Sequence, residues 1–522
     1  MINMNLSRAV HMLKRWAVTF LALLFIPVFA GNVGAVDFPP GQSPHRDMPI
    51  PGEAYPPPLP PGNVDLSLVS YEFRNAYTLG VQSFVFCFPY LYNALLRWQI
   101  ITQEPEDPDN IPYIPLNYFW HSRQLSEGGT GGSPNNDTLY SVALVDVSEE
   151  PFILSHPDIP GNRYFSFQIA GFDSDNFAYV GTRTTGQQGG SFALIGPEYV
   201  CRNPSGKVKR PEWCLPPDVT LLPRSKTNTI IVLARIFVED TDDVTNVHVL
   251  QDQIELTPLS LWGTGIPVPE DRDVLQPFPL TDPLGRWKTI NAVMEEFPEE
   301  PRHRAMLNWF KSIGIGRGAD PEDMSQDVKN ALALAWLAGY RILDDAATDG
   351  VGSIDVNNWF YPPEGFGRSG VYDDYLLRAA TQSLAGIIAN DAEEAVYIIN
   401  EKDGNDNQLK SSLPYTVRFA PGDLPDVDAF WSLTMYSSAN FDFVSNPIDR
   451  YKINDQTPGI EFDPDGGLTI YIQNTPPVGH ESNWLPSEAG NKDFYLIIRA
   501  YLPGPSLVNA TWVPPSVVLT GP

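Results

Sequence analysis

The sequence predicts an α+β, predominantly β protein, with two β-sandwich-like domains separated by a mostly helical region. Three observations support this fold class. Short β-branched and aromatic runs, broken by Gly, Pro, Asn and Asp, fill residues 136–240 and return from Tyr415 onward. The sequence between these two blocks contains residue patterns typical of helix N-termini. The chain has 522 residues, of which 43% are hydrophobic, enough for two ordinary cores.

Residues 1–35 have the layout of a secretory signal peptide. Three basic residues precede the apolar run Trp16–Ala30, no acidic residue occurs before Asp37, and small residues at 33–35 offer a cleavage site. We therefore expect a secreted or periplasmic protein, cleaved after Ala35 or, alternatively, after Ala30. A second possibility is a protein anchored by this segment left uncleaved. We expect no membrane span in the processed chain.

The remaining chain divides into four parts. Residues 36–65 are dense in proline and predict an extended tether, because proline cannot donate to helix or sheet hydrogen bonds. Residues 66–280 predict an N-terminal β-rich domain that opens with a helical stretch. Residues 281–400 predict the helical region, and residues 401–522 predict a C-terminal β-sandwich that packs with it.

The same two-residue motif, Asp followed by Pro, marks two expected helix starts in the middle region. Asp282 precedes Pro283, and Asp320 precedes Pro321. An aspartate at the N-cap followed by proline at the first helical position is a typical helix start. We expect helices to begin at both places.

The charge balance excludes some partners. With 34 Lys and Arg against 63 Asp and Glu, the net charge is −29. Such an acidic surface repels nucleic acid and polyanions at long range. A small-molecule or glycan ligand remains possible, including a small anion held by a local arginine cluster, and so does a homo-oligomer.

The three cysteines predict one disulfide. In an exported protein, Cys201 and Cys214 could close a loop, while Cys87 lies in apolar text and is expected to be a buried thiol. The alternative, that all three are free, stays open because sequence does not show distances. We expect no metal site, because no histidine pairs with a cysteine or another histidine at ligand spacing.

The familiar catalytic signatures are missing from this sequence. It contains no nucleophile elbow, phosphate loop, zinc-protease motif or dinucleotide fingerprint, so no cofactor is predicted. The remaining candidates for a functional site are polar residues that lie within apolar sequence around the segment Ser133–Ser141. The set is His121, Arg123, Asn135, Asp137, Tyr140, Arg183 and Arg235.

Two interpretations of this set compete. In the catalytic one, His121 transfers protons, Asp137 orients it, and Arg183 with Arg235 holds negative charge, while Arg123, Asn135 and Tyr140 contribute to binding. In the structural one, Asp137 pairs with Arg123 or Arg183, and the asparagines satisfy strand ends. The structural interpretation is slightly favoured, because buried ion pairs occur without catalysis.

The same residues carry a family resemblance. "SPNNDTLYSVALVDVSEEPFILSHPD" and "RYFSFQIAGFDSDNFAYVGTRTTG" resemble the bacterial proteins grouped as domain of unknown function 1254, and "AFWSLTMY", "DGGLTIYIQ" and "FYLIIRAYLP" resemble domain of unknown function 1214. The resemblance implies an exported protein with an N-terminal β-rich domain and a C-terminal β-sandwich. In the family the position that matches Asn136 usually holds an aliphatic residue. The resemblance therefore implies that Asn135 and Asp137 are the more important polar residues. Within the C-terminal motif the family-like positions include Trp431, Trp484 and Arg499.

The function therefore has two candidates. The first is an exported hydrolase or lyase acting on a small or sugar-like substrate through the His121 set. The second is a non-catalytic carbohydrate- or protein-binding surface protein, in which Trp431 and Trp484 would line an aromatic strip. Whether the protein is an enzyme stays undecided from the residues alone.

Overall fold

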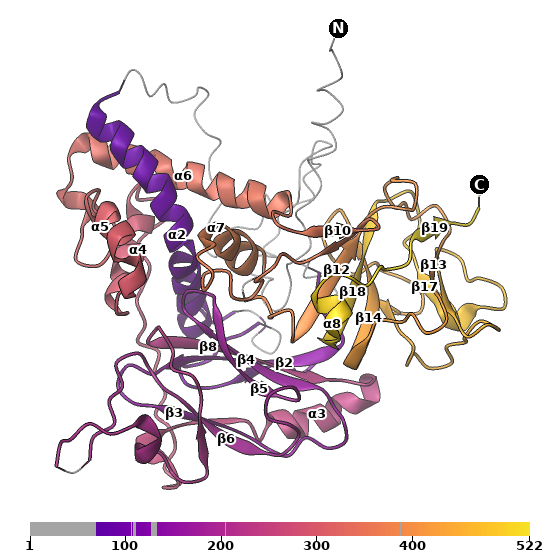
Figure 1. The fold of residues 1–522 in the computed structure, drawn as a ribbon, viewed down its shortest axis with the longest axis horizontal. Coiled ribbons are helices and arrows are strands. Elements are labelled where there is room, and N and C mark those ends of the chain that lie inside the picture. Colours follow the sequence, from indigo (N-terminus) through magenta and orange to yellow (C-terminus); the bar gives the residue numbers. More distant parts are fainter. Residues whose placement is uncertain are drawn as a thin grey trace.

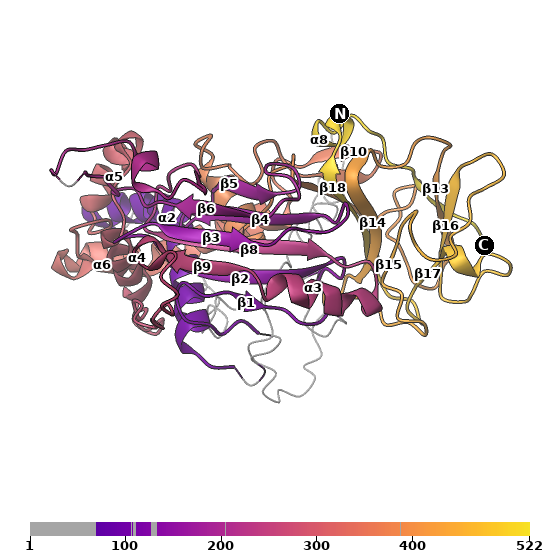
Figure 2. The ribbon, with the colours of Figure 1, turned by 90° about the horizontal axis from the view of Figure 1, so that it is seen from below.

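The computed structural model describes residues 69–521, except 106, 108–110, 127–132, 204 and 387. The expected signal peptide and tether lie outside the described residues. The predicted fold class is confirmed, since the chain forms two parts rich in strands, and the residues between them in the sequence are mostly helical (Figure 1). The helices gather at one end of the molecule and the C-terminal sheets at the other (Figure 2).

The N-terminal part contains two sheets packed face to face. A five-stranded antiparallel sheet has the order β1-β2-β8-β4-β5, and a four-stranded sheet has the order β7-β6-β3-β9. Apolar side chains such as Leu139, Phe165 and Phe192 fill the space between them. The strands are β1 (Trp120–His121), β2 (Thr138–Asp146), β3 (Phe152–His156), β4 (Phe165–Gly171), β5 (Asn176–Gly181), β6 (Gly190–Leu194), β7 (Val219–Leu221), β8 (Thr229–Phe237) and β9 (Glu255–Pro258).

The two faces of the five-stranded sheet have different roles. Successive residues of a strand point to opposite faces. On β2, Leu139 and Ala143 face the second sheet, whereas Tyr140, Val142 and Leu144 belong to a separate cluster on the other side. That other face is therefore turned toward the rest of the molecule, and the short helix α3 (Val244–Gln251) follows β8 at its edge.

The helical body is built around the long helix α2 (Tyr71–Thr102). It packs with α4 (Gly285–Glu295), α5 (Arg304–Lys311), α6 (Gln326–Thr348), α7 (Tyr375–Leu377) and a π-helix over Arg378–Ala385. Close approach of α2 and α6 requires glycine, because a Cβ at Gly80 would lie 2.6 Å from Ala335 Cβ. The helix at 71–102 therefore packs with the helical body, although it precedes the first sheet in the chain.

Among the described residues, α2 alone is long and apolar enough to cross a membrane by length and composition. Within its most apolar window, 67% of the residues are buried inside the protein. Its apolar character is thus explained by packing in the helical core.

The two expected helix starts are displaced by a few residues. The Asp282 carboxylate accepts from Leu284 N, but α4 begins at Gly285. Asp320 caps a single 3-10 turn, Pro321–Asp323, and α6 begins after the N-cap Ser325. Both aspartates bind backbone N–H groups as expected, but each closes a turn ahead of the helix.

The C-terminal part is a second pair of sheets. A six-stranded sheet has the order β10-β11-β12-β18-β14-β15, and it packs on a four-stranded sheet with the order β17-β16-β13-β19. The elements are β10 (Ile354–Val356), β11 (Trp359–Tyr361), β12 (Ala395–Asn400), β13 (Tyr415–Phe419), β14 (Val427–Ser437), β15 (Lys452–Ile453), β16 (Leu468–Gln473), β17 (Trp484–Pro486), β18 (Phe494–Pro503), α8 (Pro505–Val508) and β19 (Val517–Leu519).

The outer face of the six-stranded sheet is unusually rich in tyrosine. Tyr397, Tyr436, Tyr495 and Tyr501 share it with Phe430, and they pack against Tyr164 and Phe237 of the N-terminal part. The ends of the N-terminal strands therefore meet this face of the C-terminal sheet (Figure 2), and the contact between the two domains is aromatic and polar.

The predicted disulfide is confirmed. Cys201 and Cys214 are bonded, with their Cα atoms 5.7 Å apart, while Cys87 is a free, buried thiol. Burial raises the pKa of the Cys87 thiol to about 12, so it is not a reactive nucleophile.

Candidate functional site

The loop Ser133–Asp137 forms the seam between the two domains. The Ser133 hydroxyl lies 2.6 Å from Tyr495 Oη, and Tyr436 Oη donates to the Pro134 carbonyl at 2.6 Å. Arg499 Nη2 donates to the Ser133 carbonyl at 3.0 Å. The conspicuous polar loop of the sequence therefore binds the tyrosine-rich face of the C-terminal sheet.

Asn135 bridges one strand from each domain. Its amide nitrogen donates to Tyr140 Oη on β2 at 3.0 Å and to Tyr501 Oη on β18 at 2.8 Å. Its carbonyl oxygen accepts from Asp137 N at 2.6 Å, which fixes the loop. Because both phenol oxygens accept from Asn135, each keeps its own proton to donate elsewhere.

Asp137 forms a buried ion pair across the same seam. Its Oδ1 lies 2.7 Å from Lys452 Nζ on β15, and its Oδ2 accepts from Ser432 Oγ on β14 at 2.9 Å. Its partner is therefore Lys452, and neither Arg123 nor Arg183 binds it. The neighbouring Asn136 contributes its backbone carbonyl to Lys452, and its side-chain oxygen is buried with no hydrogen-bond partner in the described part of the chain.

His121 lies on the opposite face of the sheet from Arg235. Its Nδ1 is 2.7 Å from Ser141 Oγ on β2, and its ring stacks on Phe119 of the apolar N-terminal core. Tyr140, the residue before Ser141, points the other way toward Arg235. Burial, the largest influence, lowers the pKa of His121 to about 4. The structure therefore does not bring His121 together with Asp137 or Arg235.

The other expected residues are also dispersed. Arg123 forms an exposed ion pair with Asp252, with 2.5 Å between Nη2 and Oδ1. Trp431 and Trp484 are 2% and 3% exposed and belong to the interior of the C-terminal sandwich, so neither forms an exposed strip. Arg183 reaches the seam indirectly, through Glu394 at 2.8 Å.

Arg235 lies at the centre of the seam. It projects from β8 and is 0% exposed. Its Nη1 donates to Gln168 Oε1 at 2.8 Å and to Asn390 Oδ1 at 3.3 Å, and the guanidinium lies over the Tyr140 ring, 5.6 Å from its centroid. Its Nε and Nη2 have no hydrogen-bond partner among the described residues.

Arg499 faces the same region from the other domain. It projects from β18, is 3% exposed and lies over the Tyr436 ring. Beyond its bond to the Ser133 carbonyl, its Nε and Nη1 also lack a hydrogen-bond partner among the described residues. Tyr397 and Tyr501 are electrostatic neighbours of both Arg235 and Arg499, which places the two guanidinium groups in one cluster.

The carboxylates near these arginines have other hydrogen-bonded partners, although Asp137 is an electrostatic neighbour of Arg499 and Glu394 is one of Arg235. Within the described chain, neither arginine forms an ion pair, and the nearby carboxylates of Asp137 and Glu394 are held by Lys452 and Arg183. Burial raises the pKa of Tyr140 and Tyr501, so these phenols stay neutral and act as donors. We call the set Tyr140, Arg235, Asn390, Tyr397, Arg499 and Tyr501, with Asn135, the seam cluster.

Sequence reasoning found only part of the seam cluster. Asn135, Tyr140 and Arg235 were expected, but Asn390, Tyr397 and Tyr501 were not, and Arg499 was noted only as a family position. A signal was present in "FYLIIRAYLP", where Tyr495, Arg499 and Tyr501 are separated by even numbers of residues and so share one strand face. What this face opposes is set by tertiary contacts hundreds of residues away.

The fold and seam define a class of two-domain α+β proteins in which a buried, donor-rich cluster joins an N-terminal and a C-terminal sheet pair. Two family models match the chain. The protein of unknown function family DUF1254 covers residues 116–258, and DUF1214 covers residues 394–505. The chain thus carries both domains, in the order that the resemblance implied.

Two solved structures are similar to this chain. The VPA0106 protein from Vibrio parahaemolyticus is 21% identical, with a TM-score of 0.65, and the match covers 85% of this chain and 100% of that one. A putative uncharacterized protein from Burkholderia cenocepacia is 13% identical, with a TM-score of 0.39, covering 86% and 94%. The first shares the fold. No curated protein matches the chain.

Proposed function

We propose that this protein binds a small organic anion of the carboxylate class in the seam between its two domains. The observation that carries the proposal is the pair of buried arginines, Arg235 and Arg499, each with two guanidinium nitrogens that have no acceptor among the described residues. An unpaired buried charge costs several kcal/mol. A bound anion would offset that cost. Because the chain as a whole is strongly acidic, a buried pair of arginines is a local place where an anion would be attracted.

The chemistry of the free groups favours an anion over a neutral polar ligand. Guanidinium groups are donors only, and the Tyr140 and Tyr501 hydroxyls have protons left to donate. A carboxylate offers only acceptors and matches the planar guanidinium in a bidentate geometry. Two buried arginines, one from each domain, could hold the two ends of a dicarboxylate or share one carboxylate.

The test is a thermal-shift and calorimetric screen of mono- and dicarboxylates on the purified protein. A ligand at 100 times its Kd should stabilise the fold by about 2.7 kcal/mol. Binding should be lost in Arg235→Met and in Arg499→Met, and retained in Arg123→Met, which removes an equal charge from the surface pair with Asp252. Equal binding by all four proteins would place the anion outside the seam cluster, and no binding by any carboxylate would overturn the proposal.

Hydrolase or lyase chemistry through His121 is the weaker candidate. His121 faces the apolar core side of the sheet, away from Arg235, so it is not positioned to move a proton to an anion in the seam. A His121→Gln variant should therefore bind the seam ligand as the wild type does. Carbohydrate recognition through Trp431 and Trp484 has no support from their burial.

We also propose that the protein is exported, as secreted or periplasmic. The support is the Cys201–Cys214 disulfide, a bond that persists in oxidising compartments. N-terminal sequencing of the protein recovered from the periplasm or medium should read from Val36. A full-length chain retained with the membrane fraction would instead favour an uncleaved anchor.

A further inference from the structure

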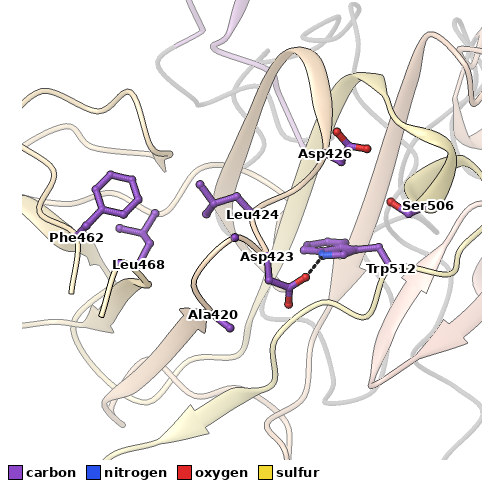
Figure 3. A pocket seen from close by; sticks show the side chains of 10 residues that line it. Ala420, Asp423, Leu424, Asp426, Phe462, Leu468, Ser506 and Trp512 are labelled. Atoms are coloured by element: carbon purple, nitrogen blue, oxygen red, sulfur yellow. Dashed lines mark hydrogen bonds between the residues drawn. The ribbon is translucent and has the colours of Figure 1, made fainter. Parts of the chain in front are cut away.

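A cavity lies in the C-terminal domain, away from the seam cluster. It has a volume of about 600 Å³ and opens at the end of the C-terminal sandwich, between the loop after β13 and the start of β16 (Figure 3). Its wall is part apolar and part acidic. The lining residues with side chains that matter here are Asp423, Leu424, Asp426, Phe462, Leu468 and Trp512.

Two exposed carboxylates line this cavity, and no cationic side chain in the described part of the chain pairs with either. Asp423 accepts one hydrogen bond, from Trp512 Nε1 at 3.1 Å, which fixes the carboxylate beside the indole (Figure 3). No side chain in the described part of the chain pairs with the Asp426 carboxylate, which lies against Gly504. The next turn contrasts with this arrangement, because Asp463 and Asp465 there are neutralised by Arg418 at 3.1 and 2.5 Å.

Aromatic and apolar groups complete the wall. The Phe462 ring is 49% exposed, and it lies across the cavity from Trp512, which is buried and stacks on Phe419 (Figure 3). Leu424 and Leu468 lie between them. An exposed aromatic ring and aliphatic side chains in one cavity with carboxylates suit an organic cation, which is attracted by charge and by the ring.

We infer that this cavity binds a small organic ammonium ion. A neutral sugar would use the aromatic rings but has no need of two uncompensated carboxylates, and the cavity walls supply no positive charge for an anion. A quaternary or alkylated ammonium group carries both features that the walls complement, a positive charge and an apolar surface. The site is independent of the seam cluster and of the function proposed for it.

The experiment compares choline with its uncharged carbon isostere, 3,3-dimethyl-1-butanol, as ligands of the intact protein. Saturation-transfer NMR and calorimetry can both measure weak binding of these probes. Choline should bind at least tenfold more tightly than the isostere. The Asp426→Asn variant should lose at least tenfold in choline affinity, and Phe462→Ala should also weaken binding.

The matched control is Asp428→Asn. Asp428 is exposed on β14, two residues from Asp426, and does not line the cavity. This variant removes the same charge and should bind choline within twofold of the wild type. Arg235→Met should do the same, since it changes only the seam cluster.

Three results would overturn the inference. The first is equal binding of choline and the isostere, which would leave only an apolar cavity. The second is an equal loss in Asp428→Asn and Asp426→Asn, which would indicate attraction to the acidic surface as a whole. The third is the absence of choline binding to a wild-type protein that circular dichroism shows to be folded.

Discussion

Asp137 joins the domains through a single ion pair. The carboxylate is 1% exposed, and its partner Lys452 is 24% exposed and can be partly hydrated. We expect Asp137→Asn to lower the free energy of unfolding by about 1–3 kcal/mol, because one buried charge-assisted contact is lost while Ser432 can still donate. Urea denaturation measures the change.

The neighbouring residue supplies the control for this experiment. The Asn136 side chain makes no hydrogen bond among the described residues, and its carbonyl contact to Lys452 survives substitution. Asn136→Ala should therefore cost less than about 1 kcal/mol. Equal losses in the two variants would show that the loop is sensitive as a whole and that the ion pair has no special part in stability.

His121 should make stability depend on pH. Its pKa is about 4 in the folded protein against 6.5 ordinarily, so between these values the unfolded chain binds the proton more readily. The contribution of the neutral His121 ring to the free energy of unfolding is fully present above pH 6.5 and decreases as the pH drops toward 4. The difference in unfolding free energy between the wild type and His121→Gln, measured at pH 7.5 and 4.5, should shrink at the lower pH.

Other buried histidines shift in the same direction, so the comparison with the variant is essential. The pKa of His156 and that of His303 are both lowered, mainly by burial. They will give both proteins a common loss of stability in acid. An identical pH profile in the wild type and His121→Gln would show that His121 titrates as in the unfolded chain.

At the scale of elements, the disulfide closes a surface loop that follows β6. The two cysteines are 13 residues apart, and the enclosed segment includes the exposed Trp213. A loop of this size predicts about 3 kcal/mol of stabilisation from the restricted unfolded chain. Unfolding in the presence of a reductant, or of Cys201→Ser with Cys214→Ser, should show a loss of up to that size.

Thiol titration is the companion measurement. The folded, oxidised protein should show no rapidly reacting thiol, because Cys87 is buried and its pKa is raised to about 12. One thiol should appear on unfolding without reductant, and three with it. A fast thiol in the folded protein would contradict the bonded pair.

The helices and strands could be predicted from the sequence more accurately than the tertiary contacts between them. The strands of the two sheet pairs follow from local alternation and turn residues, and β2, β8, β14 and β18 are where the sequence places strands. Helix starts were less exact, because an aspartate before proline caps a tight turn as readily as a helix, as at Asp320. The partner of Asp137 could not be predicted, since Lys452 is 315 residues away and nothing local distinguishes it from other lysines.

At the scale of the whole molecule, the seam should make the two domains unfold together. The tyrosine-rich face of the C-terminal sheet packs on Tyr164 and Phe237, and the loop Ser133–Asp137 binds it through several hydrogen bonds. Native-state hydrogen exchange should give the slowest amides of β8 and β18 the same free energy of opening. A lower value for one domain alone would show that it opens independently.

The seam also sets an order of events during synthesis. Asn135 emerges 366 residues before its partner Tyr501, and Ser133 emerges equally far ahead of Arg499. At about 5–20 residues per second, the ribosome takes roughly 20–70 s to cover that interval. Throughout this time α2 can cover most of the Arg235 face of the first sheet, but the loop Ser133–Asp137 lacks its partners on β18. A nascent chain stopped before β18 would therefore leave this end of the sheet open to solvent and to chaperones.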